Sequence, residues 1–209
     1  MPFTASDNDT LRYLALGDSY TIGESVPHDE RWPVQLAAEL RTHGIPCGEP
    51  EIVARTGWTT DELSAALDSA SPRGPFGLVS LLIGVNNQYR GRDTANYRME
   101  FRALLRRAVA YADGKAQHVL VVSIPDWGVT PFAAGRDRAQ IAREIDAFNL
   151  ISHEEALSAG TGYVDITPGS RHAANNRGLV AKDGLHPSGA MYRAWVEAAL
   201  PVVRSMLER

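Results

Sequence analysis

The chain has little of several features that would point to other kinds of protein. A single cysteine, Cys47, among 209 residues cannot form an internal disulfide or supply a thiol pair for a metal. With 21 Lys and Arg against 25 Asp and Glu, the net charge of -4 gives no electrostatic reason to approach nucleic acid or an anionic membrane. No run approaches the roughly 18 consecutive apolar residues of a membrane span. We therefore expect no nucleic-acid partner and no stable membrane association.

The beginning of the chain also lacks the features of a secretory signal. Its first ten residues have neither the basic start nor the apolar stretch of a secretory signal, which predicts a cytoplasmic protein. What is present is ordinary globular composition, with 44% hydrophobic and 22% charged residues. A chain of this length builds one complete core, so we expect a single domain over residues 1–209.

Short apolar runs alternate with longer segments of helical spacing. The expected strands are 13–16, 51–54, 78–83, 118–124 and 162–166. The expected helices are 33–41, 60–69, 97–112, 136–158 and 188–207, the fourth of them long enough to contain a break. Right-handed crossovers wind such an alternation into a three-layer α/β/α sandwich around a flavodoxin-like five-stranded parallel sheet.

Parallel sheets of this kind bind ligands at the carboxyl ends of their strands. Ser19, Gly57, Asn86 and Asp126 follow the first four expected strands. Residues that are more than a hundred positions apart in the sequence should therefore lie together at one edge of the sheet.

Ser19 leaves the first expected strand through a glycine turn, Gly17-Asp18-Ser19. A serine hydroxyl is a weak nucleophile that needs a base and a group to orient that base. Of the six histidines, only His186 has an acid, Asp183, three residues away in a loop punctuated by Gly and Pro. Pro187 is expected to open the last helix, whose positive end favours a neutral, proton-accepting His186. Capping of that helix is the alternative role for the pair.

Acyl transfer also needs donors for the developing oxyanion. The backbone N–H of Ser19 is one candidate. Another is the N–H of Gly57, which lies just ahead of a helix start marked by the capping-box spacing of Thr59 and Glu62. The third is the side-chain amide of Asn86 or Asn87, at the end of the most apolar strand.

Together these segments resemble the SGNH branch of the GDSL hydrolases over essentially the whole chain. Gly17-Asp18-Ser19 matches the first block of the family, Gly57 the second, residues 84–87 the third, and Asp183 with His186 the fifth. The resemblance implies an esterase without metal or organic cofactor. Its nucleophile would be Ser19, its base His186, the partner of that base Asp183, and its oxyanion hole Ser19, Gly57 and Asn86.

One position departs from the family. Asn87 stands where the third block usually has Asp, and by register it supports the loop beside the donor Asn86. We count Asn87 as a candidate substrate-binding residue. Four aromatic residues are further candidates for the lining of an acyl or alcohol pocket: Trp58, Tyr89, Trp127 and Phe132.

The resulting hypothesis is a serine carboxylesterase that acts on a small-molecule ester, with a small acyl group, through a Ser19 acyl-enzyme. A lysophospholipase or thioesterase of the same family is the alternative, and the acyl group could also pass to an alcohol instead of water. Three other classes use the same architecture. A flavin-binding protein could cradle the FMN phosphate in the hydroxyl-rich loop 19–25, and a metal-dependent phosphoesterase could use Asp18, Asp183 and His186. The third is a catalytically silent relative that binds sugars or acyl groups.

Overall fold

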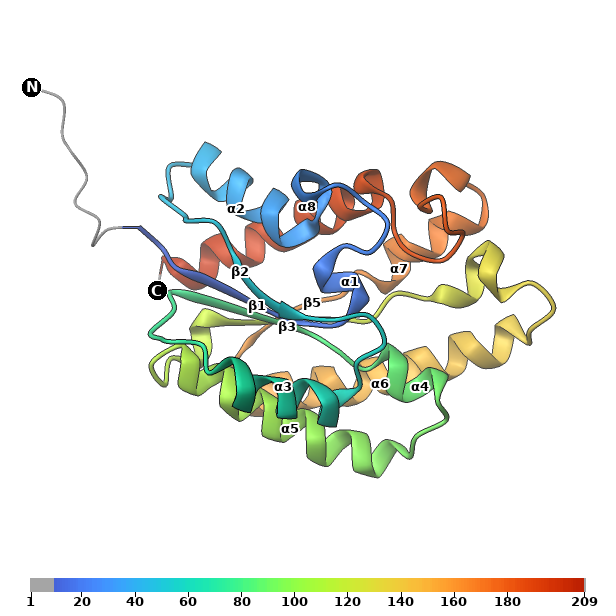
Figure 1. The fold of residues 1–209 in the computed structure, drawn as a ribbon, viewed down its shortest axis with the longest axis horizontal. Coiled ribbons are helices and arrows are strands. Elements are labelled where there is room, and N and C mark those ends of the chain that lie inside the picture. Colours follow the sequence, from blue (N-terminus) through green and yellow to red (C-terminus); the bar gives the residue numbers. More distant parts are fainter. Residues whose placement is uncertain (1–9, 209) are drawn as a thin grey trace, which may run out of the picture.

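A five-stranded sheet in the order β2-β1-β3-β4-β5 forms the centre of the computed structural model, which describes residues 10–208 (Figure 1). The strands are β1 (Tyr13–Gly17), β2 (Glu51–Ala54), β3 (Leu78–Leu82), β4 (Val119–Val122) and β5 (Gly162–Val164). Every neighbouring pair is parallel, so the flavodoxin-like sheet expected from the sequence is confirmed.

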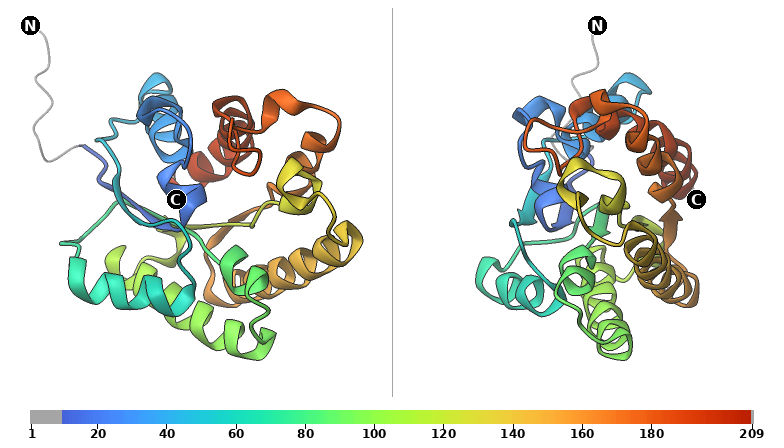
Figure 2. Two further views of the ribbon diagram at one scale, coloured as in Figure 1. Left: turned by 45° about the vertical axis from the view of Figure 1, so that its right-hand side comes forward. Right: turned by 90° about the vertical axis from the view of Figure 1, so that its right-hand side faces the viewer.

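Helices cover both faces of this sheet, which gives the three layers. They are α1 (Ser19–Ile22), α2 (Trp32–Thr42), α3 (Thr60–Ala70), α4 (Val85–Tyr89), α5 (Thr94–Tyr111), α6 (Arg138–Ala159), α7 (Thr167–Ser170) and α8 (Gly189–Leu207). Helices α2 and α8 pack together on one face, and α3, α5 and α6 lie on the other (Figures 1 and 2). Among the described residues, none of the helices has both the length and the apolar character needed to cross a bilayer.

The expected long helix 136–158 is continuous and begins slightly later. Asp137 caps it by accepting the N–H of Gln140 at 2.9 Å, and Gly160 ends it in a left-handed conformation with φ of 72°. The expectation that Pro187 opens the last helix is wrong. Ser188 is the cap, because its hydroxyl accepts the N–H of Met191, and α8 begins at Gly189.

Strand register sets the level at which the loops leave the sheet. Strands β1, β3 and β4 are buried along their whole length, as central strands covered on both faces are. The last residue of β1, Gly17, pairs with Ala54 at the end of β2 and with Leu82 at the end of β3. The three segments that follow these strands therefore start side by side.

Candidate active site

A cavity of about 170 Å³ lies at the carboxyl edge of the sheet. Its lining comprises Ser19, Tyr20, Thr56, Gly57, Val85, Asn86, Tyr89, Trp127, Phe132, Leu185 and His186. The serine, the histidine, the glycine and the asparagine singled out in the sequence thus line one space, although they come from four separate loops.

Ser19 is the first residue of α1, directly after β1, and is only 5% exposed. Asp18 caps this short helix, since its Oδ1 accepts the N–H of Tyr20 at 3.0 Å. Gly17 has to be a glycine, because a side chain there would collide with Thr21 and with the carbonyl of Leu82. The turn from strand to helix therefore presents Ser19 at the floor of the cavity.

Asp183 and His186 form a hydrogen-bonded pair, with 2.6 Å between Asp183 Oδ2 and His186 Nδ1. The other carboxylate oxygen accepts the backbone N–H groups of Leu185 and His186 at 2.9 and 3.0 Å, and the hydroxyl of Ser25 donates to Oδ2 at 2.7 Å. Burial opposes ionisation, but these hydrogen bonds hold the pKa of Asp183 well below its usual range. An ionised Asp183 places the ring proton on Nδ1 and leaves Nε2 of a neutral ring as the acceptor.

The loop that carries this pair closes on itself just before α8. The N–H of Ala181 donates to the carbonyl of His186 at 2.7 Å, and the N–H of Ser188 donates to that of Leu179 at 3.0 Å. Tyr20 packs its ring edge against the imidazole, with 5.7 Å between the centroids. His186 is therefore fixed by its own loop and by the residue next to Ser19. Ser188, not the acid–histidine pair, caps the last helix.

The second predicted donor lies in a tight turn. Residues 55–58 form this turn, in which the N–H of Trp58 donates to the carbonyl of Arg55 at 3.2 Å. Gly57, its third residue, has φ of +85°, a value that glycine adopts at this position of a type II turn. In such a turn the amide of the third residue does not take part in the closing hydrogen bond, so the N–H of Gly57 is available as a donor.

Helix α4 supplies the side-chain donor and holds the neighbouring loop. Nδ2 of Asn86 lies 2.9 Å from the carbonyl oxygen of Trp58, which uses one of its two hydrogens and leaves the other for a ligand in the cavity. Asn87 is fully buried, accepts the N–H of Thr60 at 3.1 Å and donates to its hydroxyl at 2.7 Å. Of the two amides, Asn86 therefore lines the cavity, and Asn87 supports the neighbouring loop.

Two of the candidate substrate-binding residues lie outside the cavity lining. Asn87 binds Thr60 and does not line the cavity, so the expectation that Asn87 binds substrate is corrected. Trp58 contributes its carbonyl to Asn86, and its half-buried side chain packs against the hydrophobic core. Hydrogen bonds to Thr60 hold the side chain of Asn87 away from the cavity, and packing against the core holds that of Trp58.

Three of the expected aromatic residues form one wall of the cavity. Tyr89 and Trp127 meet with 5.4 Å between ring centroids, and Phe132 lies 6.2 and 6.0 Å from them. The indole N–H of Trp127 donates to Gln88 at 2.8 Å, and the guanidinium of Arg136 lies 5.1 to 5.5 Å from all three rings. Gln88 of α4 therefore holds Trp127 in place, and the guanidinium of Arg136 lies over the three rings.

The loop 19–25, considered above as a phosphate cradle, is already engaged in this site. Ser25 donates to Asp183, and the Glu24 carboxylate accepts the hydroxyl of Thr56. A carboxylate in this position repels a phosphate. For the metal alternative, no three His, Cys, Asp or Glu side chains among residues 10–208 are grouped so that they could hold a metal ion.

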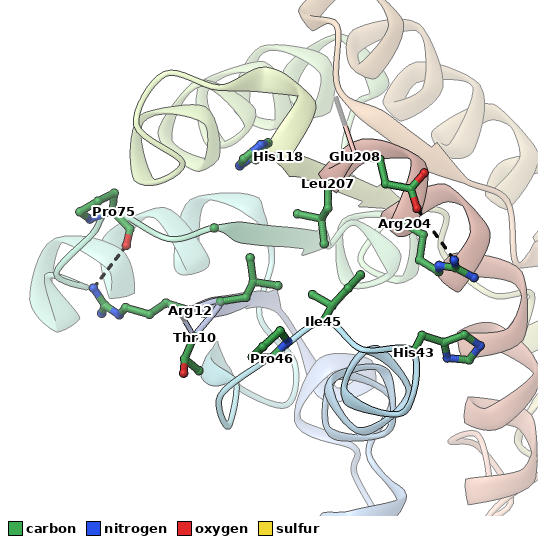
Figure 3. A pocket seen from close by; sticks show the side chains of 12 residues that line it. Thr10, Arg12, His43, Ile45, Pro46, Pro75, His118, Arg204, Leu207 and Glu208 are labelled. Carbon is green, nitrogen blue, oxygen red and sulfur yellow. Dashed lines mark hydrogen bonds and ion pairs between the residues drawn. The ribbon is translucent and has the colours of Figure 1, made fainter. Parts of the chain in front are cut away.

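A second, wider hollow of about 680 Å³ lies at the opposite edge of the sheet (Figure 3). Its two arginines are engaged locally: Arg12 donates to the carbonyl of Pro75 at 3.3 Å, and Arg204 lies 3.9 Å from Glu208. No serine of the described chain lines it. The candidate active site is therefore the smaller cavity, which Ser19 and His186 line.

Several residues of the site carried no signal in the sequence. Ser25 donates to Asp183, and Tyr20 packs against His186. Both residues follow Ser19 closely in the sequence, and this short spacing was the available hint. Gln88 fixes Trp127 from α4, one residue beyond the matched family block. These contacts join segments that are far apart in the chain, which no local pattern encodes.

Asp18 has an unusual environment for a carboxyl group next to a nucleophile. It is fully buried, and its Oδ2 has no hydrogen-bond partner among the described residues. Burial raises the pKa of Asp18 to about 7. The folded protein therefore binds a proton here that the unfolded chain releases near pH 4.

Replacing Asp18 with Asn is expected to stabilise the protein at pH 8 and to have a clearly smaller effect at pH 5. A raised pKa in the folded state means that the parent loses stability as the pH rises from about 4 to about 7, by on the order of 4 kcal/mol. Asparagine keeps the acceptor for Tyr20 and does not titrate. Urea unfolding at both pH values measures the difference, with the exposed Asp29→Asn as control. Equal effects of Asp18→Asn at the two pH values would contradict a buried proton.

A parallel sheet that brings a serine, an acid–histidine pair and oxyanion donors to one edge is the architecture of an ester hydrolase. A family model described as the GDSL-like lipase/acylhydrolase family matches residues 15–194. The chain belongs to this family and is an ester-hydrolysing enzyme, so the resemblance drawn from the sequence motifs is confirmed.

Solved structures share the fold at low sequence identity. The structure of TesA matches with a TM-score of 0.71 and 21% identity, over 93% of this chain and 99% of that one. The psychrotrophic esterase EstA from Pseudoalteromonas sp. matches with a TM-score of 0.68 and 16% identity, over 95% of this chain and 99% of that one. Axe2, an acetylxylan esterase from Geobacillus stearothermophilus, matches with a TM-score of 0.70 and 17% identity, over 92% of this chain and 94% of that one. No curated protein sequence matches the chain.

Proposed function

We propose that this enzyme is a carboxylesterase that hydrolyses small-molecule esters through an acyl-enzyme on Ser19. The observation that carries the proposal is the shared cavity of Ser19 and His186, in which His186 is held 2.6 Å from the carboxylate of Asp183. An oriented imidazole beside a serine is the arrangement that activates a hydroxyl at neutral pH.

In the first half of the reaction, Nε2 of His186 takes the hydroxyl proton of Ser19 while Oγ attacks the ester carbonyl carbon. The charge that develops on the carbonyl oxygen is stabilised by the N–H groups of Ser19 and Gly57 and by Nδ2 of Asn86. His186 then gives its proton to the leaving alcohol as the carbon–oxygen bond breaks, and the acyl group remains on Ser19.

Water completes the cycle by the same route in reverse. It gives a proton to His186 as its oxygen attacks the acyl-enzyme, and the second tetrahedral intermediate uses the same three donors. The bond to Oγ breaks, the proton returns to Ser19, and the carboxylic acid leaves. Because its pKa lies well below its usual range, Asp183 stays ionised and stabilises the imidazolium in both halves.

A small acyl group suits the space that is present. The cavity of about 170 Å³ is smaller than the roughly 300 Å³ at which pockets for larger ligands begin, and the three aromatic rings close one side. Two of the similar structures are described in matching terms, one as an acetylxylan esterase and one as inhibited by monoethylphosphonate. The acetyl group of the first description and the ethyl group of the second each have two carbons.

Truncating the aromatic wall should change the preference for acyl length. Phe132 is 42% exposed, so Phe132→Ala should leave the fold intact while it opens one side of the cavity. We expect parent activity to fall from acetate to decanoate p-nitrophenyl esters, and the variant to gain roughly tenfold on the long esters relative to acetate. Leu157→Ala, an exposed residue of α6, is the control.

The same comparison separates the proposal from its alternatives. Ester chain-length rates are measured beside an acetylated sugar, an acyl-CoA and a lysophospholipid. Highest kcat/KM on a short ester or a sugar acetate supports the carboxylesterase. Highest kcat/KM on the acyl-CoA or the lysophospholipid contradicts the small acyl group and favours a thioesterase or a lysophospholipase.

A further inference from the structure

We propose that Arg90 is a positioning residue of the oxyanion hole, which holds the turn at Gly57 so that its N–H faces the reacting carbonyl. The proposal rests on the proposed function, because an oxyanion hole has meaning only for acyl transfer. Arg90 follows the last residue of α4 and does not itself line the cavity. It acts through the backbone that does.

The guanidinium of Arg90 connects three separate elements. Its Nη2 donates to the carbonyl of Gly57 at 2.7 Å, and its Nη1 lies 3.3 Å from Oε1 of Glu62 in the first turn of α3. The other oxygen of Glu62 accepts the N–H of Thr59 at 2.9 Å. One side chain therefore fixes the end of α4, the turn after β2 and the start of α3 relative to each other.

The turn needs such an anchor because its donor amide is not held by the turn itself. With φ of +85° at Gly57, the chain occupies a region open to glycine, and glycine has easy access to the alternatives as well. In those alternatives the peptide that carries the Gly57 N–H points elsewhere. An external bond to the carbonyl of the same residue raises the cost of that rotation.

Arg90 works with the residue one helical turn before it. Asn86 and Arg90 are four positions apart, so their side chains leave α4 on the same side. Asn86 holds the carbonyl of Trp58 at 2.9 Å and Arg90 holds that of Gly57 at 2.7 Å. Two consecutive carbonyls are thus bound by one helix, and these bonds fix the chain directly after the Thr56–Gly57 peptide, which carries the donor N–H.

Charge adds to this geometry. A side chain at Gly57 would place its Cβ 3.7 Å from Nη2 of Arg90, so the cation sits directly beside the donor turn. The ion pair with Glu62 is exposed, 43% and 40% for the two side chains, and a pair of this kind contributes little to folding stability. Loss of Arg90 should therefore appear in the transition state and hardly at all in the stability of the protein.

The test compares Arg90→Met, which keeps the stem and removes the donors, with Arg92→Met. Arg92 is the matched control because it pairs with Asp61 of the same helix α3, at 2.5 Å, and binds no backbone of the turn. We expect Arg90→Met to lower kcat about tenfold, a fraction of the 10²- to 10³-fold cost of a whole donor, with KM within about twofold of the parent. Arg90→Lys, which can still donate to Gly57, should recover part of the loss.

A second readout reports on the oxyanion hole alone. An alkylboronic acid forms a tetrahedral, negatively charged adduct on a serine, so its inhibition constant should rise in Arg90→Met by about the factor by which kcat/KM falls. Values of kcat/KM and of the inhibition constant within twofold of the parent would overturn the proposal. So would a melting temperature lowered enough to account for the lost activity. If Ser19→Ala removes activity in the same assays, the hydrolase mechanism stands even where the role of Arg90 fails.

Discussion

Replacing Ser19 with alanine is expected to lower kcat by at least about 10⁴-fold while the protein stays folded. In the proposed mechanism Ser19 supplies the oxygen that forms the acyl-enzyme, and without it the remaining groups can only bind the ester and stabilise a charge that develops far more slowly. Because the side chain is small and lies at the surface of a cavity, its loss leaves no void in the core. Hydrolysis of p-nitrophenyl acetate, beside thermal unfolding, measures both quantities.

The other members of the triad define how this loss should combine. His186→Ala is expected to cost about as much as Ser19→Ala, and the double variant no more than either, because the two groups act as a unit. Asp183→Asn should retain more activity than either. Ser69→Ala, on the outer part of α3, is the control. Parent-like hydrolysis by Ser19→Ala would show that another group is the nucleophile.

Removing the side-chain donor has the second large effect. Asn86→Ala is expected to lower kcat by about 10²- to 10³-fold, the usual cost of one oxyanion donor, and to leave KM nearly unchanged. Part of this loss comes from the carbonyl of Trp58, which Asn86 also binds at 2.9 Å. Steady-state kinetics on a short ester, at matched protein concentration, gives the two constants separately.

Its neighbour provides the contrasting variant. Asn87→Ala should lower the free energy of unfolding by about 1 to 3 kcal/mol, because it leaves the buried N–H of Thr60 without its acceptor and removes the hydrogen bond that the Thr60 hydroxyl accepts. At temperatures where the protein is folded, kcat should change much less than in Asn86→Ala. If Asn87→Ala had the large catalytic effect and Asn86→Ala did not, the donor would be assigned one residue too early.

Much of the fold could be predicted because its signals are local. Buried strands of a parallel sheet appear as short apolar runs, as in β3, and even at the edge of the sheet the expected 51–54 coincides with β2. Ends were less accurate where a different local structure takes over. The expected strand 118–124 begins at Val119 because residues 116–118 form a 3₁₀ turn, and the expected 162–166 ends at Val164.

The site divides in a similar way. Ser19, Gly57, Asn86 and His186 could be placed together because topology alone brings strand ends to one edge. The residues that hold them could not, since the bond from Ser25 to Asp183 spans 158 positions. The exclusion of Asn87 and Trp58 from the cavity also depends on hydrogen bonds between separate segments, which become visible only in three dimensions.

Helix α4 makes this site sensitive to insertions and deletions of single residues, whose effects differ from those of substitutions. Within five positions, Asn86, Asn87, Gln88 and Arg90 bind the carbonyl of Trp58, Thr60, Trp127 and the carbonyl of Gly57. One residue inserted or deleted in a helix turns everything beyond it by about 100°. An insertion after Val85 would therefore move four contacts at once, on both sides of the cavity. Chain-length variation in relatives of this enzyme should thus avoid α4 and concentrate in exposed segments such as 113–115, between α5 and β4, which lie outside the cavity lining.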